Sequence, residues 1–344
     1  MHMADALLSP AVGGTMRVAT AGTIAYCAKK VQEEQDDRKV PLMGVLGAFI
    51  FAAQMINFSI PATGSSGHLG GGMILAILLG PYAAFLTIAS VLTVQALFFA
   101  DGGLLALGCN IFNLGIFPCF LAYPLLYKPL AGKKPTPLRI SLGATIAAIV
   151  GLQLGALGVV FETVASGISE LPLSAFLSAM LPIHLAIGLV EGIVTTTVVT
   201  FIWRARPEIL ELTADSRPLG GLRTGKIVTA FAAAAMVIGG ALSWFASSSP
   251  DGLEWSMAKV SGKQELEGPD RGIHQSLATL QKKIAFLPDY SFKSGDAETA
   301  SKAESPKWSV VDSGKTTSGL VGGALTLALA LMIGILLRKR QRPA

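Results

Sequence analysis

Long apolar runs separated by short polar stretches dominate the chain. We count nine hydrophobic segments, at approximately 8–28, 40–58, 69–79, 81–99, 104–127, 138–161, 174–203, 226–246 and 319–337. A run of about 20 apolar residues is long enough for a helix to cross a lipid bilayer. The pattern therefore predicts an all-α, polytopic membrane protein whose helices are these runs.

The segment at 69–79 is shorter than the others. Gly80 and Pro81 break one long apolar stretch in two, and the eleven residues before the break would reach only about 16 Å as a helix. The hydrocarbon core of a bilayer is about 30 Å thick, so this helix cannot cross it alone. We therefore expect a short or half-inserted helix that begins near His68.

The composition supports this class and argues against a nucleic-acid partner. Hydrophobic residues make up 51% of the 344 residues and charged residues only 14%, whereas soluble domains carry about 25% charged residues. The net charge of +5 comes from basic residues that gather at the ends of apolar runs. In membrane proteins such residues set topology.

The basic residues predict the orientation in the membrane. Lys and Arg concentrate in four stretches, at 29–39, 128–139, 204–226 and 338–342. The positive-inside rule places such stretches in the cytoplasm. Three short stretches hold neither residue, at 59–68, 100–103 and 162–173. We therefore expect the N-terminus and His68 on the outer side of the membrane, and the C-terminus in the cytoplasm.

The first residues, Met1-His2-Met3, offer nitrogen ligands for a metal ion. A free α-amine, the His2 amide nitrogen and a His2 ring nitrogen can wrap one ion in adjacent small chelate rings, and His68 could complete a four-nitrogen plane. Square-planar nitrogen ligation suits Ni2+ or Cu2+ and disfavours Zn2+. Glycines around His68 let the main chain approach a ligand closely. The alternatives are a start methionine followed by an uninvolved histidine, and a flexible outer loop.

Seven other polar residues fall at membrane depth: Gln54, Asn57, Asn110, Asn113, Gln153, His184 and Glu191. The pair Asn110 and Asn113 and the pair His184 and Glu191 have spacings that put each pair on one helix face. Buried polar groups in membrane helices mark functional sites or join helices by hydrogen bonds. The amide side chains could orient the histidines. For His184 and Glu191 we favour a structural or coupling role over metal ligation.

Residues 247–318 are predominantly polar and begin with the run Pro250, Asp251, Gly252, Leu253 and Glu254. With little apolar periodicity, they predict a small or partly ordered extracytoplasmic loop in which His274 is solvated. The chain contains no phosphate-binding loop and no metalloprotease or serine-hydrolase motif. If the protein moves a solute against a gradient with ATP, another chain hydrolyses the ATP.

Three motifs resemble a known family. Residues 1–10, the Gly67-His68 loop and residues 184–192 are similar to the NikM/CbiM family, the nickel and cobalt substrate-binding (S) components of energy-coupling factor transporters. The run 250–254 with its flanking helices resembles the NikN-type accessory subunit, fused at the C-terminal side. The resemblance implies three parts: a seven-helix S component (1–205), a cytoplasmic linker (206–225), and a NikN-like segment (226–344) of two transmembrane helices around the loop 247–318.

The resemblance also implies ligands and partners. The metal would be held by the Met1 amine, the His2 amide nitrogen, the His2 imidazole and His68. The cargo would be Ni2+, which we favour, or Co2+, which serves cobalamin biosynthesis. The partners would be lipid, a transmembrane coupling protein (the T component) and two cytoplasmic ATPase subunits, in a bacterial or archaeal plasma membrane. The chain itself would be no enzyme. The alternatives are a stand-alone metal channel or secondary carrier, and a non-transporting regulatory membrane protein.

Overall fold

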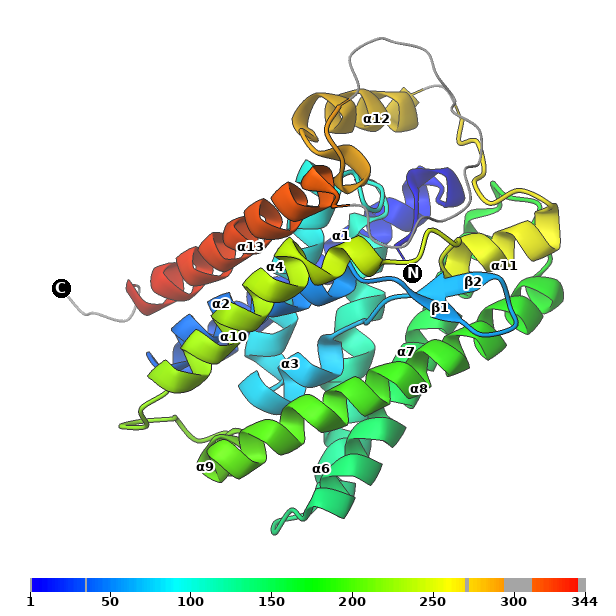
Figure 1. Cartoon of the computed structure of the whole chain (residues 1–344). Coiled ribbons are helices and arrows are strands. Elements are labelled where there is room, and N and C mark those ends of the chain that lie inside the picture. Colours follow the sequence, from blue (N-terminus) through cyan, green and yellow to red (C-terminus); the bar gives the residue numbers. More distant parts are fainter. Residues whose placement is uncertain (1, 35, 270–271, 294–310, 340–344) are drawn as a thin grey trace.

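The computed structural model describes residues 2–34, 36–269, 272–293 and 311–339. In it the apolar runs form a bundle of long helices (Figure 1). The N-terminal part contains a short 3-10 turn η1 (Asp5–Leu7) and the helices α1 (Pro10–Glu34), α2 (Lys39–Gln54), α3 (Gly72–Leu79), α4 (Pro81–Phe98), α5 (Leu107–Ile111), η2 (Phe112–Tyr127), α6 (Lys128–Ala131), α7 (Pro137–Ser166), α8 (Leu173–Ala205) and α9 (Pro207–Ala214). The prediction of a helical membrane protein is confirmed.

Within the described residues, five helices are long and apolar enough to cross a membrane, at 81–98, 107–131, 137–166, 173–205 and 313–337. The second of these is continuous from α5 through η2 to α6, and its middle part has the wider π-helical turn. Pro118 and Pro124 lie inside that part. Proline has no N–H to donate to a regular α-helical hydrogen bond, and a π-helical turn is one way for a helix to continue past it.

The short helix predicted near His68 is α3, which spans only Gly72–Leu79. It ends at Gly80, whose φ of 80° is readily adopted only by glycine, and Pro81 then starts α4. All eight residues of α3 are buried. This helix therefore lies inside the bundle and places the His68 loop at one end of it.

Residues 58–67, expected to form a loop, form a two-stranded antiparallel hairpin of β1 (Phe58–Ile60) and β2 (Ser65–Gly67). In its register, Phe58 pairs with Gly67 and Ile60 with Ser65. The apolar pattern does not predict it, because its strands are only three residues long. The hairpin leads directly into His68.

The C-terminal part adds α10 (Gly225–Gly240), η3 (Leu242–Phe245), α11 (Gly252–Ser261), α12 (Gly272–Ile284), η4 (Pro288–Tyr290) and α13 (Ser313–Lys339). The helices α10 and α13 pack side by side against α2. We call residues 247–293 the accessory region. Its helix α11 packs on α8 and its helix α12 contacts α4, above the end of the bundle that holds the N-terminus (Figure 1).

The described part of the accessory region is more ordered than the sequence predicts. His274, expected to be solvated, is only 8% exposed, and its Nε2 lies 2.8 Å from the carbonyl oxygen of Leu8. Leu253, Met257 and Leu287 are buried in contacts with the rest of the molecule. The expectation of a solvated His274 was therefore wrong, because these contacts come from residues far away in the sequence.

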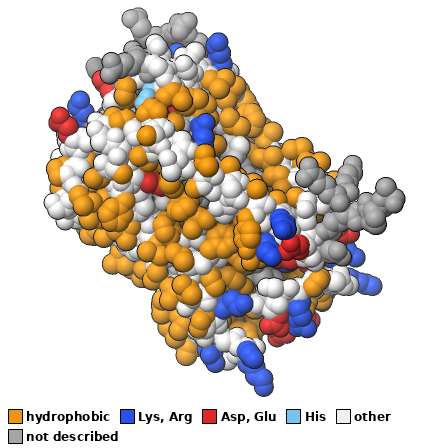
Figure 2. Space-filling model, turned by 180° about the vertical axis from the view of Figure 1, so that it is seen from behind, with side chains coloured by type: hydrophobic (Ala, Val, Ile, Leu, Met, Phe, Trp, Pro, Cys, Tyr) orange, Lys and Arg blue, Asp and Glu red, His pale blue; other side chains and the backbone are white. Residues whose placement is uncertain are grey.

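The surface separates apolar and basic side chains. Figure 2 shows hydrophobic side chains across the middle of the molecule and most Lys and Arg side chains at its lower end, where Figure 1 places α6 and α9. Exposed large hydrophobic residues include Leu185, Leu189 and Ile193 of α8. The accessory region lies at the opposite end of the molecule from α6 and α9 (Figure 1).

Candidate metal centre

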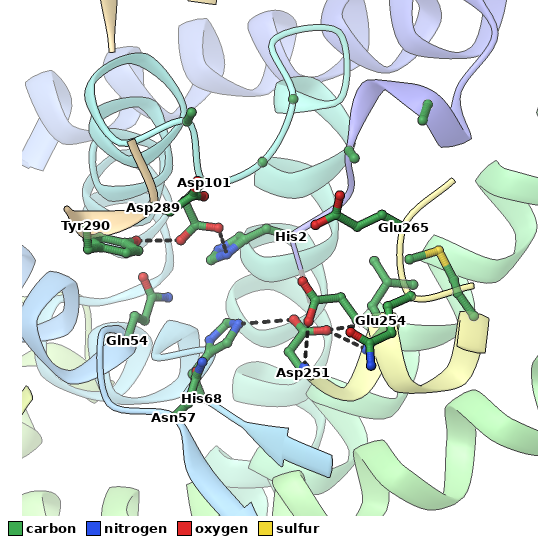
Figure 3. Close-up of a pocket in the computed structure, with 18 of the residues that line it drawn as sticks. His2, Gln54, Asn57, His68, Asp101, Asp251, Glu254, Glu265, Asp289 and Tyr290 are labelled. Atoms are coloured by element: carbon green, nitrogen blue, oxygen red, sulfur yellow. Dashed lines mark hydrogen bonds and ion pairs between the residues drawn. The ribbon is translucent and has the colours of Figure 1, made fainter. Parts of the chain in front are cut away.

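A cavity of about 520 Å³ lies where the N-terminal residues, the hairpin end and the accessory region meet (Figure 3). Its polar lining comes from these three parts, from the end of α2 and from the turn after α4, and it includes His2, Gln54, Asn57, His68, Asp101, Asp251, Glu254, Glu265, Asp289 and Tyr290. Two of the three predicted ligand residues, His2 and His68, thus line one cavity. Met1 lies outside the described residues.

Asn110 holds the extended N-terminal segment in place. The backbone N–H of Met3 donates to Asn110 Oδ1 at 2.8 Å, and Asn110 Nδ2 donates to the carbonyl of Met3 at 3.2 Å. The same carbonyl accepts from Gly103 N at 2.9 Å, and Met3 is fully buried. Asn110 therefore fixes the backbone next to His2 rather than a histidine ring.

The His2 side chain is only 7% exposed, and its Nδ1 lies 2.8 Å from Asp101 Oδ1. An ionised carboxylate only accepts hydrogen bonds, so Nδ1 of His2 is the donor in this contact. Among the described residues, His2 Nε2 has no hydrogen-bond partner. Burial alone would raise the pKa of Asp101, but His2 and the Tyr290 hydroxyl outweigh it and hold that pKa below its usual range.

The His68 ring stacks on the His2 ring, with centroids 4.9 Å apart and planes 15° apart. Its Nδ1 donates to the carbonyl oxygen of Leu69 at 3.0 Å, which leaves Nε2 as the basic nitrogen. That Nε2 lies 3.9 Å from Asp251 Oδ2. Burial lowers the pKa of His68 to about 3, so the ring is neutral at ordinary pH.

One face of α8 supports the loop after His68. Glu191 accepts hydrogen bonds from the backbone N–H groups of Gly70 and Gly71, at 3.0 Å each, and is 3% exposed. From the other side, Gln54 Nε2 donates to the Gly70 carbonyl at 2.9 Å. Glu191 therefore acts on the loop backbone and lies outside the cavity lining.

His184, seven residues earlier on the same face, lies under the accessory region. Its Nδ1 donates to the Met180 carbonyl at 2.8 Å, and the ring is 1% exposed. A Cβ atom added to Gly252 would lie 3.0 Å from His184 Cε1 and 2.9 Å from Ile187 Cδ1. A Cβ atom on Gly67 would lie 2.5 Å from Ile187 Cγ1. Both glycines therefore allow main chain to pack directly on α8.

The run from Pro250 to Glu254 forms the start of α11. Asp251 Oδ1 accepts from the N–H groups of Leu253 and Glu254, at 2.7 and 2.9 Å, and Glu254 Oε2 accepts from Asp251 N at 2.9 Å. This reciprocal capping box satisfies donors at the helix N-terminus. The carbonyl of Pro250 accepts from Ser66 N at 2.8 Å, which ties the motif to the hairpin.

The remaining predicted residues divide between the cavity and the bundle. Asn57 lines the cavity, and its carbonyl accepts from Ser247 N at 2.7 Å. Asn113 lies away from it and donates to Glu162 Oε2 at 2.7 Å, inside the bundle. Glu162 is 8% exposed and was not predicted, because the apolar run at 138–161 ends one residue before it, whereas α7 continues to Ser166.

Two residues of the cavity, Asp101 and Tyr290, were also missed. Tyr290 Oη donates to Asp101 Oδ2 at 2.5 Å (Figure 3). Asp101 is the single acid in the stretch 100–103, which the sequence marks as free of Lys and Arg. Its importance follows only from its position beside His2.

The two histidines can provide nitrogen ligands, but a complete metal site needs further ligands besides the described side chains. Among the described residues, no group of three His, Cys, Asp or Glu side chains is placed to hold a metal ion. A chelate that includes the His2 backbone nitrogen uses the nearby ring nitrogen, Nδ1, which faces Asp101 in the structure. To close that chelate, Nδ1 has to exchange Asp101 for the metal.

Comparison with known proteins identifies two regions. A family model described as the cobalt uptake substrate-specific transmembrane region matches residues 2–209, and a model of the PDGLE domain matches residues 225–339. The chain is 32% identical over 225 residues to the fused nickel transport protein NikMN of Rhodobacter capsulatus, covering 61% of this chain and 64% of the relative.

Two further relatives are also named for metal transport. A Haloquadratum walsbyi protein named for metal transport is 35% identical over 210 residues, which cover 61% of this chain and 93% of the relative. The crystal structure of a transition metal transporter is 32% identical and superposes with a TM-score of 0.54, over 61% of this chain and 96% of that one. Since the first family model matches more than half of the chain, this protein belongs to the family of cobalt uptake substrate-specific transmembrane proteins, carries a PDGLE domain after that region, and is a component of cobalt or nickel transport rather than an enzyme.

Proposed function

We propose that the chain is the substrate-binding component of an ATP-driven importer of the energy-coupling factor type, and that it captures Ni2+ at the outer face of the membrane. The observation that carries this proposal is the juxtaposition of His2 and His68, whose ring centroids are 4.9 Å apart at one cavity. Residues 1–205 form the metal-binding part, residues 206–225 a cytoplasmic linker, and residues 226–344 the NikN-like part.

The ligands proposed are the Met1 amine, the His2 amide nitrogen, the His2 imidazole and the His68 imidazole. Four nitrogens in one plane favour Ni2+ over ions that prefer a tetrahedron. Nitrogen ligands also suit Co2+, and relatives of the chain are named for both metals. The planar geometry and the fused PDGLE domain lead us to favour nickel.

The distribution of charge supports the proposed orientation. The cavity lies beside the N-terminus and the accessory region, whereas on the face shown in Figure 2 most Lys and Arg side chains lie at the lower end, near α6 and α9. The positive-inside rule assigns that end to the cytoplasm, so the cavity would face outward and the C-terminus inward. Carboxylates around the cavity, among them Asp101, Asp251 and Glu254, would attract a divalent cation.

The proposed partners supply the energy. The sequence contains no phosphate-binding loop, so a transmembrane coupling protein and two cytoplasmic ATPase subunits would drive the release of metal to the inside. Uptake of radioactive nickel should then require the ATPase subunits in the same membrane. Uptake that continues without them would refute the ATP-driven mechanism and favour a channel or secondary carrier.

A binding measurement tests the ligand set directly. Nickel should bind purified protein that keeps its native N-terminus, and His2→Ala or one added N-terminal residue should abolish binding. A residue added at the C-terminus is the matched control and should change nothing. His68→Ala should weaken binding but leave some, because three nitrogens remain. Full nickel binding by the N-terminally extended protein would refute the assignment, and competition with Co2+ would measure the metal preference.

A further inference from the structure

One segment of the accessory region holds the turn that carries Asp101. Four carbonyl groups in the last turn of α4 and in the turn after it accept hydrogen bonds of 2.8–3.2 Å from this segment. The donors are Gln281, Leu287 and Asp289, and the acceptors are the carbonyls of Ala96, Phe98, Phe99 and Gly102. The position of Asp101 is thus set by residues more than 170 positions later in the chain.

Tyr290 completes this contact with its side chain. Its ring stacks on Phe99, with centroids 5.2 Å apart and planes 20° apart, and its hydroxyl donates to Asp101 Oδ2 at 2.5 Å. The other carboxylate oxygen, Oδ1, faces His2 Nδ1 at 2.8 Å. A continuous line of contacts therefore runs from Tyr290 through Asp101 to His2, as Figure 3 shows.

The backbone at both ends of this contact adopts an unusual conformation. Ala100 has a φ of 54°, and the successive residues Asp289 and Tyr290 have φ of 49° and 58°. Residues other than glycine seldom adopt positive φ, and they keep it where the surrounding structure holds them. Three such residues meet at Asp101, so the packing on both sides fixes this geometry.

We propose that Tyr290 is a positioning residue for the His2 imidazole and acts through Asp101. The hydroxyl occupies one carboxylate oxygen and orients the other toward Nδ1 of His2. Because the carboxylate accepts the Nδ1 proton, it fixes the ring tautomer as well as its direction. The inference rests on the proposed function only in taking His2 as a ligand residue.

The accessory region would then contact and orient both histidine rings of the site. Asp251, in the PDGLE motif, lies beside His68 Nε2, and Tyr290 acts on His2 from the far end of the same region. Since a chelate through His2 Nδ1 has to displace Asp101, Tyr290 determines the ring orientation from which metal loading starts. A PDGLE domain that only stabilised the fold would have no such effect.

The test reads the tautomer of His2 without any metal. The chain has four histidines, so 15N-histidine NMR spectra of the metal-free protein can be assigned with single variants of His68, His184 and His274. In the unsubstituted protein, His2 should carry its proton on Nδ1 alone. Tyr290→Phe keeps the ring stacking but loses the hydroxyl, and should shift His2 toward a mixture of tautomers. Tyr26→Phe is the matched control and should leave the His2 signals unchanged.

The result that overturns the proposal is a His2 spectrum that stays the same in Tyr290→Phe, or an unsubstituted protein with the His2 proton on Nε2. Should Tyr290→Phe fail to fold, Asp101→Asn provides the same comparison, because it keeps the side-chain shape and removes the anionic acceptor. Unchanged His2 signals in Asp101→Asn would equally overturn the proposal. Nickel is then added to the unsubstituted protein as a separate measurement. A lack of binding there would refute the proposed function and leave the tautomer result standing.

Discussion

Replacing Gly252 by alanine should disturb the candidate metal centre without touching any proposed ligand. The added Cβ would lie 2.9 Å from Ile187 Cδ1 and 3.0 Å from His184 Cε1, whereas carbon atoms in good contact lie about 3.5–4.0 Å apart. Both neighbours belong to one buried face of α8, so their side chains or α11 have to shift. We expect α11 to move, which would shift Asp251, the preceding residue, away from His68.

The expected cost follows from overpacking. Extra methyl groups in a packed interior cost about 1–3 kcal/mol, and about 1.4 kcal/mol corresponds to tenfold in an equilibrium constant. We expect Gly252→Ala to lower the thermal midpoint in detergent and to weaken nickel binding by about fivefold or more. Gly225→Ala is the matched control: it also opens a helix, and no heavy atom lies within 4 Å of the added Cβ.

A second substitution makes the prediction sharper. Ile187→Val removes the Cδ1 atom that the new methyl group would meet, at an intrinsic cost of about 0.5–1.5 kcal/mol. The double variant should therefore be less destabilised than the sum of the two single variants. If Gly252→Ala matches Gly225→Ala in both stability and nickel affinity, the packing of this motif on α8 does not matter and the reasoning fails.

Three further substitutions or conditions test other contacts. Asp251→Ala should lose a helix cap worth about 0.5–2 kcal/mol and weaken nickel binding, whereas Asp251→Asn should keep the cap, so a thermal midpoint equally low in both would contradict the capping role. Glu191→Gln leaves a buried loop N–H without its acceptor, which should lower the free energy of unfolding by about 1–3 kcal/mol. Thermal unfolding measures this loss, and Glu211→Gln on α9 is the control that should show none. Nickel affinity, titrated between about pH 8 and pH 6, should fall as the pH falls because the terminal amine, with an ordinary pKa of about 7.7–8.0, must lose its proton. Burial lowers the pKa of His68 to about 3, so this ring is already neutral in that range, and a pH dependence that disappears in His68→Ala would contradict the assignment.

The membrane-spanning architecture could be predicted because apolar length and turn residues determine it locally. The break at Gly80 and Pro81 separates α3 from α4 as predicted, since a glycine with positive φ and a proline at a helix start are local properties. The hairpin 58–67 could not be predicted, because its strands are too short to show an alternating pattern.

The lining of the cavity was only partly predictable. His2 and His68 were identified by their chemistry, and the structure places them together. Asp101 and Tyr290 are 189 positions apart, and nothing in a periodic pattern pairs residues at that separation. His274 was misjudged for the same reason, because its partner is the carbonyl of Leu8 at the other end of the sequence.

The segment that joins α8 to α10 has a consequence for how the two parts of the chain stay together. It runs by way of α9 at the end of the bundle remote from the cavity, while the two parts that it joins meet again at the hairpin and along α2 (Figure 1). A covalent connection of this kind keeps the local concentration of one part near the other high at any expression level. Because one polypeptide contains both parts, they are always present in equal numbers. Diffusion in the bilayer cannot separate the PDGLE domain from the histidines that it covers.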